Sequence, residues 1–292
     1  MLNLWIGLCK GASGLPRSIR DLNYKEHLIE WRIINSKNKE CKPEFTMCSE
    51  DMAHSVLFEW KSGPNTDAHQ LESYAGLKPE NLQQMGKMSV NATKSFDVAV
   101  VGLAEHAERL KIGIAKGKHP FPLLLVHDDG MSLAMNKFSC PALNDLFVPS
   151  FSVEYKKAPS QFVPVDADSL VWEVADVVIP QILKHMSLRD TLIDSSVIAQ
   201  AISPQWQIMH KEARAQTKHR VEEAIEQAAA GEFSSYLTWD SRASKASIID
   251  NPMEFGLDKR SNAFRKMLKL HAQFRDRLQS GRKYEYQMRL PL

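Results

Sequence analysis

Two acidic residues and a lysine, spaced across two short β-prone segments, form the most chemically suggestive pattern in this 292-residue chain. Glu44 follows a proline, and the run Glu59-Trp60-Lys61 begins fifteen residues later. Carboxylate oxygens suit Mg²⁺ or Mn²⁺, ions that keep several waters and share oxygens with substrate phosphates. Such an ion activates a water, while Lys61 would position that water and offset developing negative charge. The pattern therefore points to hydrolysis of a phosphodiester.

An antiparallel hairpin formed by residues 45–49 and 55–61 would bring these side chains together. In such a hairpin, the residue numbers of every directly opposed pair add up to the same total. Pairing Glu44 with Glu59 therefore places the turn in the polar segment midway between the strands. Opposed side chains share one face, with Cβ atoms ~4.5–5.5 Å apart, and Lys61 lies on the same face by alternation. Two opposed carboxylates need a counter-charge, which a divalent metal and Lys61 would supply.

The combination of Pro43-Glu44 with Glu59-Trp60-Lys61 resembles the PD-(D/E)xK nuclease superfamily. Gln70 and Tyr74 resemble the QxxxY element that RecB-like members carry on the helix after the lysine strand, and their i, i+4 spacing places them on one helix face. The resemblance covers roughly residues 20–130. It implies that Glu44 and Glu59 are metal ligands and that Lys61 is the catalytic lysine. The Trp60 carbonyl would be a further ligand, and Gln70 and Tyr74 would reach the site or a DNA strand.

Members of this superfamily often supply another acid from the first helix. The sequence predicts a helix over Asp21–Ile34, with Asp21 as a possible N-cap, although Trp31–Ile34 suits a strand equally well. Either Glu26 or Glu30 could supply the acid as a metal ligand, and Glu26 is slightly favoured by its more polar surroundings.

The chain departs from the superfamily at one position, because Glu44 stands where members usually have Asp. The extra methylene moves the carboxylate by roughly a bond length, and metal sites are sensitive to such shifts. Either the hairpin is adjusted or catalysis has been lost. Asp51, eight residues before Glu59, is an alternative acid, but it would lie almost within its own turn.

Further elements complete an α/β domain over residues 1–150. Residues 63–66 break the lysine strand and offer Asn65 or Thr66 as the cap of a helix over Asp67–Ala75. Continuous apolar runs at 96–102 and 121–127 predict buried strands, and the helical pattern between them predicts a parallel pair with a crossover helix. The fold class is thus α/β: by the resemblance, a restriction-endonuclease-like mixed sheet flanked by helices.

A mainly α-helical domain is expected over residues 165–292, after a linker at 156–166 rich in Lys, Pro and Ser. We see no convincing strand there. Residues 255–292 contain ten Lys or Arg and three acids, a net charge of +7 that leaves −5 for the preceding residues. This basic segment could contact a phosphate backbone or be an ordinary solvated helix face. The helical patterns cover 169–186, 191–201, 207–229 and 262–280.

The overall composition is that of a soluble globular protein, with 43% apolar and 25% charged residues and a net charge of +2. No apolar run reaches the ~18 residues of a membrane helix, and the start of the chain lacks a signal peptide's features. The cysteines form no CxxC pair, which favours reduced thiols in a cytoplasmic protein and no structural zinc. They are Cys9, Cys41, Cys48 and Cys140.

Two other polar groups have an ordinary explanation at least as good as a functional one. His127-Asp128-Asp129 ends a predicted strand, where α/β ligand sites concentrate, but turn chemistry explains it equally. A basic helix near Trp206 carries His210, Lys211, Arg214, Lys218 and Arg220, and glutamates follow it at salt-bridge spacing. No Walker loop, GxGxxG or GxSxG motif occurs.

The sequence therefore predicts a cytoplasmic nuclease that depends on Mg²⁺ or Mn²⁺ and acts on nucleic acid, most simply DNA. The resemblance suggests a defence, repair or mobile-element system, with DNA or a protein partner bound by the helical domain and no membrane partner. The competing hypothesis is a nuclease-like domain that has lost catalysis and serves as a DNA-binding or assembly module.

Overall fold

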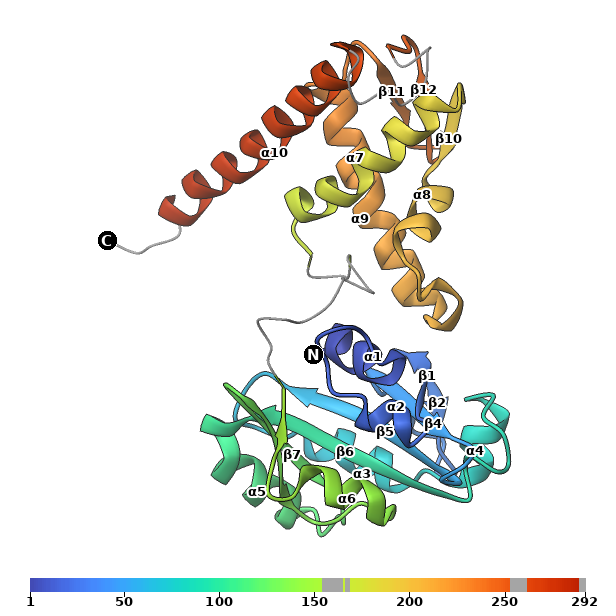
Figure 1. Cartoon of the computed structure of the whole chain (residues 1–292), viewed down its shortest axis with the longest axis vertical. Coiled ribbons are helices and arrows are strands. Elements are labelled where there is room, and N and C mark those ends of the chain that lie inside the picture. The colour runs from blue at the N-terminus through green and yellow to red at the C-terminus, as the bar shows by residue number, and fades with distance from the viewer. Residues whose placement is uncertain (154–164, 166–168, 253–261, 289–292) are drawn as a thin grey trace. The chain divides into compact units, whose positions relative to one another are not determined.

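The chain divides into two compact units (Figure 1). The computed structural model describes residues 1–153, 165, 169–252 and 262–288. The N-terminal unit comprises Met1–Phe162 with Ile208–His210, and the C-terminal unit comprises Val163–Gln207 with Lys211–Leu292. Of the expected linker at 156–166, all but Val165 lies outside the described residues.

A curled seven-stranded mixed sheet forms the centre of the N-terminal unit, in the order β1-β4-β5-β6-β7-β8-β9 (Figure 1). Its strands are β1 (Lys25–Ile29), β4 (Phe45–Ser49), β5 (His54–Lys61), β6 (Ser95–Leu103), β7 (Leu123–His127), β8 (Gly130–Met135) and β9 (Phe151–Ser152). Strands β5, β6 and β7 are parallel, and the remaining pairs are antiparallel. The predicted mixed sheet and the parallel β6–β7 pair are confirmed. A separate two-stranded sheet joins β2 (Ile33–Ile34) to β3 (Glu40–Cys41).

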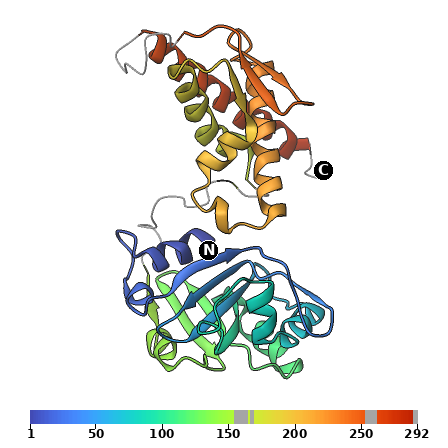
Figure 2. The same ribbon diagram turned by 90° about the vertical axis from the view of Figure 1, so that its right-hand side faces the viewer.

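Helices cover both faces of this sheet. They are α1 (Leu2–Lys10), α2 (Ser18–Asp21), α3 (Ala68–Ala75), α4 (Pro79–Gln84), α5 (Ala107–Lys116) and α6 (Pro141–Phe147). On one face, Trp5 of α1 packs on Phe58 of β5 with ring centroids 4.3 Å apart and contacts Phe147 of α6. On the other face, α3 and α5 bury Leu71 and Leu110 in a cluster with sheet residues. Figure 2 shows α1 (blue) on its side of the sheet.

The β4–β5 hairpin has the register predicted from the sequence. Phe45 pairs with Phe58 and Ser49 with His54. Continued by one residue, this register places Glu44 opposite Glu59. The turn covers residues 50–53. The helix after β5 also forms as expected, but the prediction of its cap was wrong, because Asp67 rather than Asn65 or Thr66 caps α3.

The helix predicted over Asp21–Ile34 does not form. Residues Lys25–Ile29 are the edge strand β1, which pairs with β4, and Ile33–Ile34 belong to β2. Asn23 and Glu30 have positive φ values of 55° and 50°, a conformation that no helix interior contains. The pattern of apolar residues that suggested a helix is too short to distinguish a helix from a strand. Pairing with β4 makes the segment a strand.

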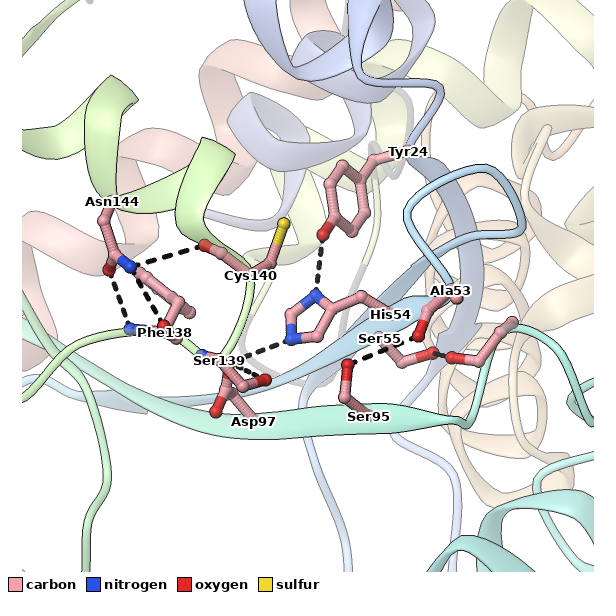
Figure 3. A network of polar contacts seen from close by, with 11 residues as sticks. Tyr24, Ala53, His54, Ser55, Ser95, Asp97, Phe138, Ser139, Cys140 and Asn144 are labelled. Atoms are coloured by element: carbon pink, nitrogen blue, oxygen red, sulfur yellow. Dashed lines mark hydrogen bonds and ion pairs between the residues drawn. The ribbon is translucent and has the colours of Figure 1, made fainter.

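A buried polar network lies on the α1 face of the sheet (Figure 3). His54 is fully buried, and its ring nitrogens contact the Tyr24 hydroxyl at 2.6 Å and Asp97 Oδ2 at 2.8 Å. The same Asp97 oxygen accepts hydrogen bonds from the backbone and side chain of Ser139. The network joins β5, β6 and the segment before α6, and it gives every ring nitrogen of His54 a partner.

The C-terminal unit is built from helices α7 (Val171–Ser187), α8 (Ser195–Ile202), α9 (Lys211–Ala230) and α10 (Asn262–Met288). The expectation of no strands was wrong, since β10 (Leu192–Asp194), β12 (Lys245–Ile248) and β11 (Leu237–Asp240) form a three-stranded antiparallel sheet. Met267 and Phe274 of α10 are fully buried in the core of this unit. The four cysteines of the chain are free thiols. Among the described residues, no helix is both long and apolar enough to cross a membrane.

Candidate active site

Four of the residues chosen from the sequence meet at the C-terminal end of β5. Lys61 Nζ donates to Glu59 Oε1 at 2.9 Å and to Gln70 Oε1 at 2.6 Å. The Tyr74 hydroxyl donates to the other carboxylate oxygen, Glu59 Oε2, at 2.7 Å. Strand β5 presents the acid and the lysine on one face by alternation, and α3 presents Gln70 and Tyr74 on one face by their i, i+4 spacing.

The burial of this cluster makes its pairing energetically important. Glu59 is only 3% exposed, and a buried carboxylate is costly unless it is paired and hydrogen-bonded. Lys61 and Tyr74 together occupy both of its oxygens. Burial, followed by the charge of Glu59 and the hydrogen bond to it, raises the pKa of Tyr74 well above its usual value. Tyr74 is therefore a neutral hydrogen-bond donor at ordinary pH.

Glu44 adjoins this cluster from the opposite strand of the hairpin. Its Oε2 accepts a hydrogen bond from the backbone N–H of Trp60 at 3.0 Å. Burial and the nearby charge of Glu59 raise the pKa of Glu44 to about 7, against the lowering effects of the Trp60 N–H and Lys61. A cation bound beside Glu44 and Glu59 would therefore be stabilised by the same negative charge that raises the pKa of Glu44.

The Trp60 carbonyl faces the same edge of β5 as Glu44. The Phe58 carbonyl accepts from the Glu44 N–H, so alternate residues of β5 direct their backbone groups toward β4. Because the N–H and C=O of one strand residue point toward the same neighbouring strand, the Trp60 carbonyl shares this direction. The ligand role expected of this carbonyl is thus compatible with the backbone geometry.

The structure brings Glu30, rather than the preferred Glu26, close to the site. Glu26 lies on β1 and forms an ion pair with Lys10 of α1. Glu30 contributes to raising the pKa of Glu44 and pairs with Lys42 at 2.8 Å. Neither lies on a helix, contrary to expectation.

The alternative acid Asp51 lies in the exposed β4–β5 turn, where it accepts a hydrogen bond from Asn23 at 2.8 Å.

Asp67 is a supporting residue that we did not single out from the sequence. Its carboxylate accepts hydrogen bonds from the backbone N–H groups of His69 and Gln70 at 2.9 and 3.2 Å. These bonds fix the first turn of α3 and so the direction of the Gln70 side chain. The signal was available, because aspartate directly before a helical pattern is a preferred N-cap.

The donor set suits a hard divalent cation only when water or substrate completes the coordination. Among the residues that the structure describes, no group of three or more His, Cys, Asp or Glu side chains could hold a metal. Glu44 and Glu59 supply two carboxylates and Trp60 a carbonyl. Mg²⁺ commonly uses one or two carboxylates, with waters and phosphate oxygens in the other positions, and this set fits that pattern.

The other candidate residues have ordinary structural contacts. His127 contacts Ser132 Oγ at 2.7 Å, and the two aspartates after it form the tight β7–β8 turn. On α9, Lys218 and Arg220 pair with glutamates one turn away. Arg214, before them, lies over the Trp206 ring. Some of the basic segment 255–292 lies outside the described residues, and the rest belongs to α10.

The fold and the cluster define an α/β protein with paired carboxylates and a lysine at the end of a central strand. The chain belongs to the MJECL32 domain family, whose model matches residues 1–163. The match includes all seven strands of the large sheet and every residue of the cluster around Lys61. No curated protein and no solved structure shows significant similarity to the chain.

Proposed function

We propose that the N-terminal unit is a metal-dependent nuclease that hydrolyses phosphodiester bonds in DNA. The observation that carries this proposal is the position of Lys61 Nζ, held 2.9 Å from Glu59 and 2.6 Å from Gln70. Glu44 lies beside this group, with a pKa raised partly by the charge of Glu59. A partly buried lysine beside two carboxylates is an arrangement that can position a water and stabilise charge on a phosphate.

Glu44, Glu59 and the Trp60 carbonyl are the residues that would hold Mg²⁺ or Mn²⁺. The bound ion would lower the pKa of a water and stabilise the charge on the phosphate. Lys61 would hold that water in position by donating a hydrogen bond. Gln70 and Tyr74 would orient the lysine and Glu59, because each already bonds to one of them.

DNA cleavage with matched variants tests this proposal. Plasmid and linear DNA would be incubated with the full chain and either Mg²⁺ or Mn²⁺. Glu59→Gln and Lys61→Met should each lose roughly 100-fold or more of the rate, the size of effect seen when one charge-stabilising group is removed. Lys39→Met is the control, because the side chain of Lys39 is 42% exposed and pairs with Glu72 of α3 rather than with the cluster around Lys61. Full activity of either site variant would contradict the assignment.

Metal binding gives a readout that does not depend on turnover. Calorimetric titration with Mn²⁺ should show one site in the wild-type chain and a much weaker one in Glu44→Gln and Glu59→Gln. Circular dichroism of each variant would establish that it is folded. Equal Mn²⁺ affinity in all three proteins would remove these carboxylates from the proposed site.

A second function is a nuclease-like DNA-binding or assembly module without catalysis. Two observations favour it. Glutamate stands at position 44, where the resembled superfamily usually has aspartate, and the described residues contain no group of three or more His, Cys, Asp or Glu that could hold a metal. This alternative predicts DNA binding with no cleavage in either metal. The substitution Glu44→Asp separates the two functions further, since a gain of cleavage would identify the extra methylene as the cause of inactivity.

A further inference from the structure

A cavity of about 580 Å³ lies between the start of α3 and the side of α5 that carries Arg109, Ile112 and Gly113. Its size falls within the ~300–1,000 Å³ range of small-ligand sites. Leu71 and Ile112 supply apolar walls, and Asn65 and Thr66 supply polar groups from the segment that joins β5 to α3. At Gly113 the helix approaches this segment so closely that a Cβ would lie 2.2 Å from Thr66 Oγ1.

Two cations at this cavity are available to a ligand. Arg109 and Lys116, both exposed, line it from α5. Neither side chain has an ion pair or hydrogen-bond partner within the described part of the chain. Lys111 on the same helix, in contrast, pairs with Glu108 at 3.0 Å. The cavity therefore combines an apolar surface with unneutralised positive charge.

The cavity shares its supporting elements with the Lys61 cluster. Ala68 and Leu71 of α3 face the cavity, while Gln70 and Tyr74 of the same helix bond to Lys61 and Glu59. Asp67 caps α3 at the end that lines the cavity, and its pKa is lowered by backbone hydrogen bonds, chiefly that from Gln70, and further by the charge of Lys61. A strand that places one phosphate at Lys61 can thus extend directly over this cavity.

Apolar walls beside unpaired cations match the chemistry of a nucleotide, which has a flat, weakly polar base and a charged phosphate. Proteins that bind single strands combine positive charge along the backbone with surfaces on which the bases pack. In a duplex the faces of a base are covered by its neighbours, so a base can enter a protein pocket only when it is unstacked.

We propose that this cavity binds one unstacked nucleotide of a single-stranded DNA segment, next to the phosphate held at Lys61. The base would pack on Ala68 and Ile112, and the adjacent phosphate would be bound by Arg109 and Lys116. This inference rests on the proposed nuclease function, and it assigns single-stranded DNA, or a strand end opened from a duplex, as the substrate.

Binding measurements with full-length variants test the proposal. Fluorescence anisotropy would be recorded with a labelled thymidine 12-mer and with a duplex of equal length, in buffer with a chelator so that no cleavage occurs. Arg109→Gln/Lys116→Gln should weaken single-strand binding by roughly tenfold. It should also reduce the slope of log binding constant against log salt concentration by about 1.4, or about 0.7 per lost phosphate contact. Ile112→Asn should weaken binding severalfold without changing the slope. Both should affect the duplex much less.

The control variant is Lys111→Gln/Lys118→Gln, which removes the same charge from α5 and the turn after it but no residue that lines the cavity. An equal loss of affinity in this control, or unchanged single-strand binding in both cavity variants, would overturn the proposal. All substituted positions are at least partly exposed, and thermal melting would verify the fold of each variant.

Cleavage assays on the same samples separate this inference from the proposed function. Wild-type cleavage of DNA together with unaltered binding by the cavity variants would leave the nuclease standing and remove the nucleotide site. Selective loss of single-strand binding without any wild-type cleavage would support the cavity and contradict the nuclease. A wild-type chain that neither binds nor cleaves DNA would contradict both.

Discussion

At the scale of single residues, the chemistry of the site depends on how Glu59 is compensated. The side chain is almost fully buried, in a place where water cannot solvate a carboxylate. Lys61 neutralises one oxygen and Tyr74 donates to the other. The two contacts on which the proposed catalytic role depends are therefore also those that allow the carboxylate to be buried.

We expect Tyr74→Phe to lower the free energy of unfolding by about 1–3 kcal/mol, because it leaves a buried Glu59 oxygen without its donor. Urea denaturation followed by circular dichroism would measure this change. Ser73→Ala is the neighbouring control. Within the described residues its hydroxyl donates to the His69 carbonyl of α3 alone, and we expect an effect under about 0.5 kcal/mol. Equal effects of the two substitutions would show that the Tyr74–Glu59 bond is energetically unimportant.

At the scale of elements, β5 carries different chemistry on its two faces. Glu59 and Lys61 point toward α3, while His54 points toward the α1 face and the network of Tyr24 and Asp97 (Figure 3). Alternation along one strand keeps the two groups on opposite sides of the sheet. We therefore assign the His54 network to holding β5 and β6 in place rather than to catalysis.

His54→Leu should lower the free energy of unfolding by about 2–4 kcal/mol, since it leaves both the Tyr24 hydroxyl and Asp97 with one partner fewer in a buried place. The DNA cleavage rate per folded molecule should stay near that of the wild-type chain. Tyr24→Phe, which removes one member only, should cost less. A large loss of cleavage in a fully folded His54→Leu protein would contradict the assignment of a structural role to the His54 face of β5.

The attachment of α10 to its unit should depend on pH. Arg277 Nε and Nη2 bond to the carboxylate of Glu232 at 2.8 and 3.1 Å. Burial tends to raise the pKa of Glu232, but the hydrogen bond and charge of Arg277 outweigh it, and the pKa lies below its usual value. A lowered pKa in the folded state means that this stabilisation is present above the ordinary glutamate pKa of about 4.3 and is lost as the pH falls through the folded value.

Arg277→Gln should therefore destabilise the chain at about pH 7 and have little effect at about pH 2.5. The side chain of Arg277 is 46% exposed, so we expect no more than about 1 kcal/mol at the higher pH. Urea titrations of the two proteins at both pH values would measure the difference. A difference that persists undiminished in acid would point to packing of the arginine stem instead.

At the scale of the whole molecule, the structure changes how the basic C-terminal segment can be tested. Deleting residues 255–292 would remove Met267 and Phe274 from the core of the C-terminal unit, so a loss of DNA binding would be explained by unfolding. Arg277 and Arg275 of α10 also have acidic partners within the unit. Charge substitutions at exposed positions are the sharper test.

If α10 contacts DNA, Arg265→Gln/Lys269→Gln should weaken the binding of duplex DNA by the full chain. The slope of log binding constant against log salt concentration should fall by about 1.8, or about 0.9 per lost phosphate contact. Both positions are exposed, so the fold should be retained. The control is Arg275→Gln/Arg277→Gln, which removes equal charge from ion-paired positions. An unchanged slope in the first variant would make this helix an ordinary solvated surface.

The sequence by itself determined the hairpin, its register and the residues that meet there. Alternation places Glu59 and Lys61 on one strand face, and i, i+4 spacing places Gln70 and Tyr74 on one helix face; both are local properties of regular backbone. The polar turn fixed the pairing of β4 with β5. These features depend on residues close together in the sequence, so the sequence pattern alone was sufficient to predict them.

Only the tertiary structure decided the elements whose identity depends on distant partners. Residues 25–29 have spacing that suits a helix or a strand, and pairing with β4 made them β1. That choice moved Glu26 to Lys10 and brought Glu30 near Glu44. The short strands of the C-terminal unit and the cavity between α3 and α5 likewise come from segments far apart in sequence. Packing against distant segments overrides a weak local preference for helix or strand. The positions of Glu59 and Lys61, in contrast, depend on alternation within one strand, which such packing does not change.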